Sequence, residues 1–170
     1  GIPYHARRVV EFNVEDKSMI EIGPDLGDRL GKYCNGIRAA NGSIYCMPWS
    51  AEYFLKIIPG ERHNAEVKTL REMQLPEGDW IAGALANDGW ICYFPLNRGR
   101  ILKLDTSDGD SLSFVGEEIN EGFEAAVLGN DGYIYGMSST RVFKFSLIDH
   151  RVSFIGRSFE QDNRLWKGAV

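Results

Sequence analysis

A pattern of roughly 45 residues recurs along this chain, and it restricts the possible folds more than any other feature. The clearest copy begins at Trp80, with small residues, an Asn-Asp-Gly turn, an aromatic segment, a proline and an aliphatic segment. The turn glycines Gly42, Gly89 and Gly132 are 47 and 43 residues apart. A unit of this size is one supersecondary element, so the chain is expected to stack several equivalent elements.

Each copy has the pattern of four β-strands. Asp88-Gly89 favours the positive φ of a tight hairpin, and Pro95 ends the second strand because proline has no N–H for the ladder. The second and third strands are apolar at alternate or successive positions, whereas the fourth mixes polar and apolar residues. The expected strands of this copy are 82–86, 90–95, 100–105 and 111–118.

Four antiparallel strands per repeat predict an all-β fold, a β-propeller of four-stranded antiparallel blades. An aromatic residue precedes each innermost strand, and a small residue follows it three positions later. Small residues suit a strand close to a crowded central axis. We expect about four blades per chain in one domain: a blade part at 1–32, blades at 33–79, 80–122 and 123–165, and a first-strand half-blade at 166–170.

The two ends of the chain match complementary parts of one blade. Gly1–Pro3 aligns with the end of a second strand, and Trp166–Val170 aligns with the start of a first strand. Because an unpaired sheet edge is prone to aggregate, we expect closure. Either Lys167–Val170 pairs with Gly1–Pro3 in one monomer, or a homodimer shares blades, or the piece belongs to a larger propeller.

Composition narrows the classes of partner. The chain has 44% hydrophobic residues and a net charge of −5, which suits a folded protein and disfavours nucleic acid and anionic membranes as partners. Its apolar windows are only strand-length, so no membrane insertion is expected. The three cysteines Cys34, Cys46 and Cys92 are expected to be buried, unpaired hydrophobes, which weakly favours a reducing, cytoplasmic location.

Catalytic signals are sparse in the sequence. The three histidines, His5, His63 and His150, fall in separate loops and are expected to be solvent-exposed. The chain has no nucleophile-elbow, phosphate-loop, zinc-protease or calcium-loop pattern. The sequence therefore predicts no catalytic residue, no metal ligand and no cofactor, and it favours a noncatalytic protein.

One set of loops stands out by composition. The connections from fourth to next first strands, together with Glu124 at a strand start, hold ten acids against three bases. The loops after the second strands add aromatic and polar residues to the same face. Propellers commonly bind ligands where such loops converge. The predicted binding residues are Tyr4, His5, Trp49, Glu52, Asp79, Asn97, Arg98 and Glu121.

The repeated Trp, small residues, Asn-Gly or Asp-Gly turn, Ile-Tyr, proline and aliphatic strand resemble the β-propeller repeats of the kelch-like and NHL-like type, over essentially the whole chain. This resemblance implies a binding or scaffold module. We expect a protein or peptide partner, basic in character, at the acidic and aromatic loop face. The alternative is a carbohydrate-binding or carbohydrate-active propeller, in which Trp49 stacks on a sugar and Asp79 and Glu121 flank the bond.

Overall fold

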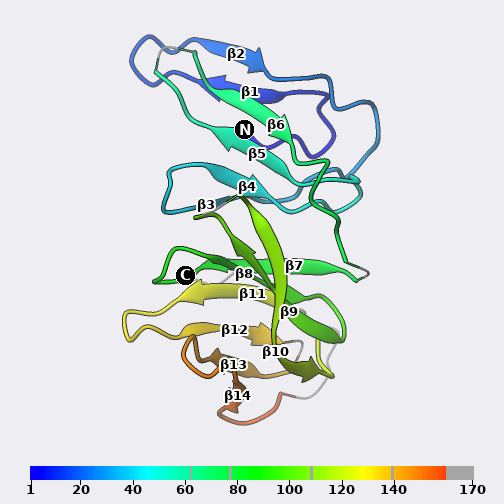
Figure 1. Cartoon of the computed structure of the whole chain (residues 1–170), viewed down its shortest axis with the longest axis vertical. Coiled ribbons are helices and arrows are strands. Elements are labelled where there is room, and N and C mark those ends of the chain that lie inside the picture. Colours follow the sequence, from blue (N-terminus) through cyan, green and yellow to red (C-terminus); the bar gives the residue numbers. More distant parts are fainter. Residues whose placement is uncertain (62, 77, 108, 139, 160–170) are drawn as a thin grey trace. The chain divides into compact units, whose positions relative to one another are not determined.

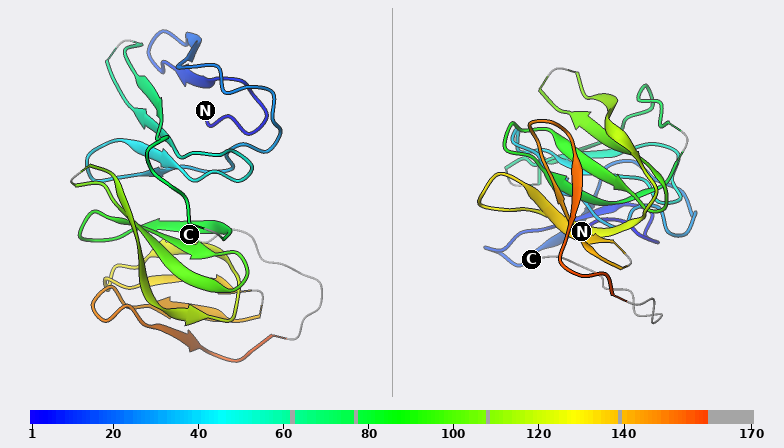
Figure 2. Two further views of the ribbon diagram at one scale, coloured as in Figure 1. Left: turned by 45° about the vertical axis from the view of Figure 1, so that its right-hand side comes forward. Right: turned by 90° about the horizontal axis from the view of Figure 1, so that it is seen from below.

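A computed structural model describes residues 1–61, 63–76, 78–107, 109–138 and 140–159. In these ranges every regular element is a β-strand. The chain divides into two compact units, Gly1–Pro76 (unit 1) and Glu77–Val170 (unit 2), and Figures 1 and 2 show the strands of each. The expected half-blade at 166–170, and with it the pairing of Lys167–Val170, lies outside the described residues.

Unit 1 holds a two-stranded and a four-stranded antiparallel sheet. The smaller sheet is the hairpin β1–β2, and the larger has the sequential order β3-β4-β5-β6. Gly1 lies beside β1, because its backbone forms hydrogen bonds with Val10 of that strand. The strands are β1 (Val9–Phe12), β2 (Met19–Ile22), β3 (Ile37–Arg38), β4 (Ile44–Cys46), β5 (Leu55–Ile58) and β6 (Glu66–Thr69).

Unit 2 holds two four-stranded antiparallel sheets, β7 to β10 and β11 to β14, each with neighbouring strands in chain order. Strands β7 and β11 lie beside each other, so the two sheets pack through their first strands. The strands are β7 (Trp80–Leu85), β8 (Ile91–Pro95), β9 (Gly99–Asp105), β10 (Ser111–Ile119), β11 (Phe123–Leu128), β12 (Ile134–Ser138), β13 (Val142–Phe145) and β14 (Val152–Ile155).

The predicted all-β class and the four-stranded antiparallel sheets are confirmed. Burial also follows the expected order of the strands. β8 is buried at all five positions, whereas the fourth strands β6, β10 and β14 consist mostly of exposed and partly buried residues, with Val67 and Val115 as the buried ones. A second strand is covered on both faces, whereas a fourth strand lies at the sheet's edge, where polar residues are tolerated.

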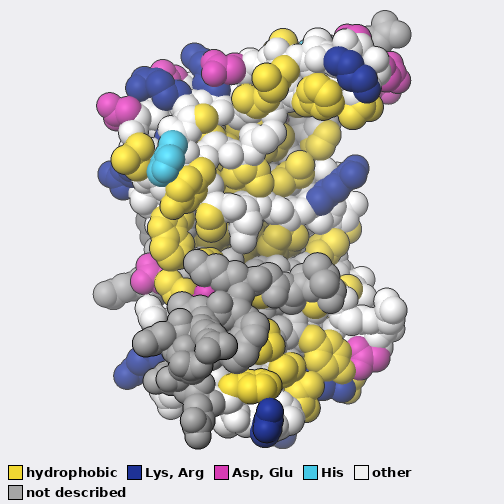
Figure 3. All heavy atoms as spheres, turned by 180° about the vertical axis from the view of Figure 1, so that it is seen from behind, with side chains coloured by type: hydrophobic (Ala, Val, Ile, Leu, Met, Phe, Trp, Pro, Cys, Tyr) yellow, Lys and Arg dark blue, Asp and Glu magenta, His cyan; other side chains and the backbone are white. Residues whose placement is uncertain are grey.

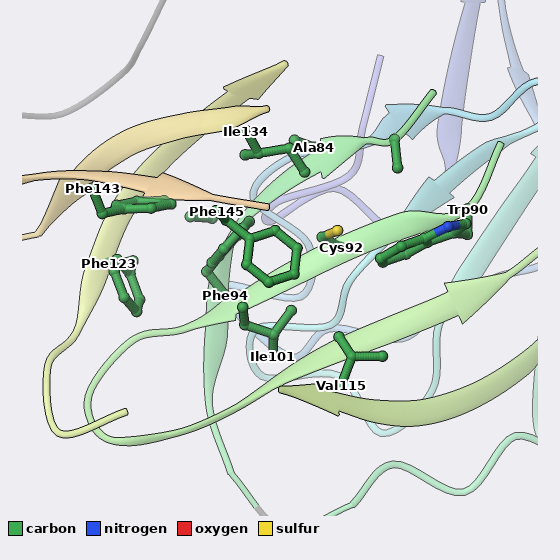
Figure 4. Packing of buried hydrophobic residues seen from close by; sticks show 12 residues of the cluster. Ala84, Trp90, Cys92, Phe94, Ile101, Val115, Phe123, Ile134, Phe143 and Phe145 are labelled. Atoms are coloured by element: carbon green, nitrogen blue, oxygen red, sulfur yellow. The ribbon is translucent and has the colours of Figure 1, made fainter. Parts of the chain in front are cut away.

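The core of unit 2 is built from aromatic rings. Phe94 of β8 is fully buried, and its ring centroid lies 5.6 Å from Phe123, 5.0 Å from Phe143 and 5.6 Å from Phe145. Figure 4 shows these rings between strands of the two sheets. Phe94 therefore joins the sheets by tilted and edge-to-face ring contacts, which are favourable beyond the area they bury.

The core of unit 1 is smaller and mainly aliphatic. Val9 and Ile22 of the hairpin pack in one cluster with Leu55, Ile57 and Val67 of the larger sheet. A single hairpin is marginal in water, so this contact is what stabilises β1–β2.

The repeated lysines of the third strands lie over aromatic rings. The sequence suggested snorkelling stems on a semi-exposed strand, and the structure adds a specific partner for each ammonium group. Such cation–π contacts contribute about 0.5–1 kcal/mol at exposed sites. The pairs are Lys56 over Tyr45 (5.0 Å), Lys103 over Trp90 (4.6 Å) and Lys144 over Tyr133 (3.5 Å).

The cysteine prediction is correct for two of the three residues. Cys46 and Cys92 are buried and unpaired, and burial raises the pKa of the Cys46 thiol to about 12. Cys34 is exposed, contrary to the expectation. It follows the aromatic residue Tyr33 just before the sheet begins, where the chain is irregular and the side chain is not covered by a strand.

The turn glycines have the predicted backbone conformation, with φ of +92° at Gly89 and +82° at Gly132. We expect Gly89→Val and Gly132→Val each to lower the free energy of unfolding by about 1–3 kcal/mol, because a β-branched residue resists this region. Chemical denaturation measures the loss. Asn130→Val, at an exposed turn position without positive φ, is the control. Equal losses in all three variants would contradict the turn argument.

Candidate functional site

The four predicted binding residues of unit 1 come together around the segment 29–32. The rings of Tyr4 and His5 are 4.4 Å apart between centroids, at an angle of 42°. The Nδ1 atom of His5 accepts a hydrogen bond from the backbone N–H of Gly31, at 3.0 Å. This bond fixes the imidazole. The His5 side chain therefore supports the site by accepting a hydrogen bond from the backbone of Gly31.

Tyr4 and Trp49 flank Gly31. A Cβ atom at Gly31 would lie 3.4 Å from Trp49 Cδ1 and 3.7 Å from the hydroxyl of Tyr4, and its φ of +68° is one that side chains rarely adopt. The exposed fractions of Tyr4 and Trp49 are 46% and 45%. Tyr4, His5 and Trp49 around Gly31 therefore form a half-exposed aromatic patch.

The aromatic patch rests on a buried lysine. Lys32 is 2% exposed, and its Nζ donates to the carbonyl oxygens of Arg29 (2.7 Å), Gly27 (3.2 Å) and His5 (3.3 Å). Its backbone N–H donates to the Tyr4 carbonyl, and its own carbonyl accepts from Trp49, both at 2.8 Å. Lys32 thus holds the backbone beneath both exposed rings, because an ammonium group has three donors to satisfy three acceptors.

The fourth predicted residue, Glu52, lies at the rim. Its carboxylate is 3.7 Å from the Arg29 guanidinium, which also donates to the Ser50 carbonyl at 2.6 Å. Both charged side chains are more than half exposed, so this ion pair adds little stability. The two groups are consequently open to an incoming ligand.

A cavity of about 300 Å³ lies in the same unit. Tyr33 in its wall donates a hydrogen bond from its hydroxyl to the Tyr53 carbonyl, at 2.9 Å. Burial raises the pKa of Tyr33 to about 12, so this phenol stays protonated at neutral pH. Arg71 lies 5.0 Å from the ring of Tyr53. The wall is formed by Pro24, Asp25, Leu26, Arg29, Lys32, Tyr33, Ala51, Glu52, Tyr53, Thr69 and Arg71.

The four predicted residues of unit 2 have other partners. The Asp79 carbonyl accepts from Leu96 N–H at 2.8 Å, and Gly122 approaches the backbone of Asn97, where a Cβ atom would lie 3.2 Å from its Cα. Arg98 donates from two nitrogens to Glu118, at 3.1 and 2.8 Å. Asp79, Asn97 and Arg98 therefore contact other residues of unit 2.

Glu121 pairs with Arg141, whose guanidinium lies 3.9 Å from the ring of Phe154. The Arg141 and Glu121 side chains are 32% and 25% exposed. In this partly buried pair, Arg141 contacts both the Glu121 carboxylate and the Phe154 ring. It is therefore better placed for structure than for the carbohydrate chemistry considered above.

Arginines from neighbouring segments neutralise part of the negative charge predicted for the loop face. Asp25 bonds to Arg7 at 2.7 Å, and this bond holds the pKa of Asp25 below its usual value. Glu118 and Glu121 are likewise paired with arginine. Figure 3 shows one side of the molecule, and acidic and basic side chains are interspersed in its upper part, which is unit 1. The remaining acids of the predicted face include Glu77, Glu160 and Asp162, which lie outside the described residues.

The histidine prediction holds only for His5, which is exposed. His63 is half-buried and contacts Glu11 and Ser18. His150 is half-buried between Trp90 (5.9 Å) and Phe145 (6.3 Å between ring centroids). Sequence position alone missed these contacts because the partners come from other repeats or other strands.

Sequence reasoning also missed Lys32 and Arg29 as parts of the site. One signal was present: Lys32 directly precedes the aromatic residue of its repeat, a position held by Asp79 and Gly122 in the next two. A cation there is a departure from the repeat. Its burial under the patch could not be read from the sequence, because charged residues are usually exposed.

The fold is similar to that of β-propeller lyases. No protein-family model matches the chain, and no curated protein matches it in sequence. Virginiamycin B lyase from Staphylococcus aureus, a seven-bladed β-propeller, has a TM-score of 0.63 and 13% identity over 89% of this chain and 49% of its own. The catalytically inactive H270A form of that lyase with quinupristin has a TM-score of 0.66 and 12% identity, over 93% of this chain and 51% of its own. A streptogramin B lyase has a TM-score of 0.62 and 14% identity, over 89% of this chain and 48% of its own.

The chain thus spans about half the length of these lyases. At this level of identity the likeness shows the fold alone. It confirms propeller-like blades, and it gives no support to a kelch assignment in particular. In the described residues no helix is long and apolar enough to cross a membrane.

Proposed function

We propose that the chain is a binding module that engages a protein or peptide through the aromatic patch of unit 1. The observation that supports this proposal is the pair of half-exposed rings, Tyr4 and Trp49, on a backbone fixed by the buried Lys32. Aromatic side chains on a rigid support lose little conformational entropy on binding, and Trp and Tyr are the most common energetic anchors at interfaces.

The groups near the patch suit a peptide. Arg29 and Glu52 offer one charge of each sign at the rim. Arg29 and Glu52 also line the cavity of about 300 Å³, which is at the small end of ligand sites and fits a peptide side chain. A peptide with an apolar residue for the rings and a polar residue for the rim would use both features.

The test is a peptide selected from a displayed library on the intact protein, with its affinity measured by titration calorimetry. We expect Trp49→Ala to weaken binding at least about 30-fold, since truncating an anchor costs about 2 kcal/mol or more. Phe12→Ala removes a 54% exposed aromatic residue of β1 and is the matched control. Unchanged affinity in Trp49→Ala, or an equal loss in both variants, would refute this site.

A carbohydrate is the alternative ligand for the same rings, because sugars also stack on exposed aromatic side chains. A glycan array and a titration with small sugars distinguish the two. Millimolar sugar binding that disappears in Trp49→Ala, together with no selectable peptide, would replace the peptide proposal by the carbohydrate one.

We also propose that the sheets are blades of one propeller, about four per chain, closed within a monomer or shared in a homodimer. The four sheets within the described residues and the likeness to propeller lyases support this arrangement. Light scattering tests the closure: a single species at the monomer or dimer mass is expected. A mass that rises continuously with concentration would mean open edges that associate without closing.

A further inference from the structure

A second group of side chains in unit 1 joins a carboxylate, an imidazole and a hydroxyl in one line. His63 Nδ1 lies 3.0 Å from Glu11 Oε1, and His63 Nε2 lies 3.2 Å from Ser18 Oγ. Glu11 comes from β1, Ser18 precedes β2, and His63 lies in the turn between β5 and β6 (Figure 1). The group lies at the ends of the strands opposite to the aromatic patch, because β1 leads from Tyr4 and His5 toward this turn.

The partners determine which imidazole nitrogen carries the proton in the neutral ring. An ionised carboxylate only accepts, so the Nδ1 beside Glu11 must hold the hydrogen. Nε2 then has a free lone pair that can accept the proton of the Ser18 hydroxyl. This is the arrangement in which an imidazole serves as a general base for a serine nucleophile. The competing acceptor is the Asp16 carboxylate, whose pKa is lowered chiefly by its hydrogen bond with the Ser18 side chain.

The surroundings hold the group in place. The backbone N–H of Ser18 donates to Asp16 Oδ1 at 2.8 Å, and its carbonyl accepts from Asn13 N–H at 2.9 Å. His63 has φ of +68°, an uncommon conformation for a side-chain-bearing residue. The side chains of His63 and Glu11 are 28% and 21% exposed, so the group is partly accessible from solvent.

Glu11 has the features of a positioning residue. Its second carboxylate oxygen, Oε2, is buried and has no hydrogen-bond partner among the described residues. The carboxylate of Glu11 therefore acts on its surroundings through the hydrogen bond between Oε1 and His63. A carboxylate that is partly withdrawn from water orients the ring and stabilises the imidazolium that forms when the base takes a proton.

From this geometry we infer that Ser18 is a nucleophile activated by His63 and oriented by Glu11, and that it accepts acyl groups from uncharged carboxylic esters. Nε2 takes the hydroxyl proton as Oγ bonds to the carbonyl carbon; the ester C–O bond then breaks and the imidazolium returns the proton to the leaving alcohol. Water repeats these steps on the acyl-serine and releases the acid. Asp16, two residues before Ser18, is hydrogen-bonded to it, and this contact lowers the pKa of Asp16, so its negative charge disfavours anionic esters. The intervening Lys17 is held at the Val14 carbonyl, to which its Nζ donates at 2.5 Å.

The same hydrogen bonds would also tie the β1–β2 hairpin to the β5–β6 turn, so stability alone does not test the inference. The test is covalent labelling of the intact protein with an alkyl fluorophosphonate, which bonds to Oγ and releases fluoride with the proton. We expect one label per chain, located at Ser18 by peptide mass spectrometry. Hydrolysis of p-nitrophenyl acetate is measured in parallel.

Ser18→Ala should abolish the label, and His63→Gln should slow labelling at least about 100-fold, since a positioned general base contributes roughly 10²- to 10⁴-fold. Glutamine keeps a donor and an acceptor but does not take up a proton at neutral pH. Ser113→Ala, at an exposed position of β10, is the control and should label as the parent does. Labels spread over many serines, or an unchanged rate in His63→Gln, would overturn the inference.

A thiol provides a second measurement if His63→Gln fails to fold. Ser18→Cys is made together with Cys34→Ser, because Cys34 is the exposed thiol of the described residues. Since the imidazole base would raise the thiolate fraction, the introduced thiol should be alkylated by iodoacetamide faster than in the same protein that also carries Glu11→Gln. Equal alkylation rates would mean that Glu11 does not orient His63 as a base toward position 18, and would overturn the inference as stated.

Discussion

Phe94→Ala is expected to lower the free energy of unfolding of unit 2 by about 3–5 kcal/mol, the largest effect of any single substitution considered for this protein. Phe94 is fully buried and contacts three other phenylalanine rings that come from the neighbouring sheet. Truncation removes these contacts and leaves a cavity that β-strands fill poorly, because their backbone positions are held by the ladder.

Urea denaturation followed by tryptophan fluorescence measures this loss. Phe114→Ala, on β10 of the same unit, is the control; this ring is 39% exposed and lies beside Trp80 and Arg100. Its truncation should cost clearly less, about 1 kcal/mol, because only part of the ring is removed from water. Equal losses in the two variants would show that the phenylalanine cluster is not the main stabilising contact between these sheets.

Lys32→Met is expected to destabilise unit 1 by about 2–4 kcal/mol and also to weaken binding at the aromatic patch. Methionine fills a similar volume, but the carbonyls of His5, Gly27 and Arg29 lose their donor, and buried acceptors without a partner are costly. Because Lys32 holds the backbone at Tyr4 and Trp49, the two rings should lose their fixed spacing.

Lys68→Met is the matched control. Lys68 lies on β6 of the same unit, and its side chain is 49% exposed in a surface pair with Glu66 at 2.9 Å. Such a pair contributes about 0–1 kcal/mol, so this change should be nearly neutral. Calorimetric melting gives the stability of both variants, and peptide titration gives the affinity. A Lys32→Met protein that melts and binds as the parent does would exclude the support role.

The local pattern of the sequence was sufficient to predict the class of fold. Turns such as Asp88-Gly89, with the apolar strands on either side, specify antiparallel hairpins through short-range geometry alone. The aromatic patch was partly predicted as well: Tyr4, His5, Trp49 and Glu52 were chosen because equivalent loops of successive repeats meet at one end of their strands. These features depend on residues close in sequence or related by the repeat.

The tertiary structure alone decided the partners of the charged and polar groups. The burial of Lys32 depends on carbonyls that face inward from three backbone positions, and the pairing of Glu121 with Arg141 depends on how two loops cross. His63 is 45 residues from Ser18 and 52 from Glu11 and belongs to a different sheet from both, so no spacing in the sequence marks the three as a group. Strand ladders are specified by local alternation, whereas polar contacts between sheets depend on side-chain positions that exist only once the sheets have packed.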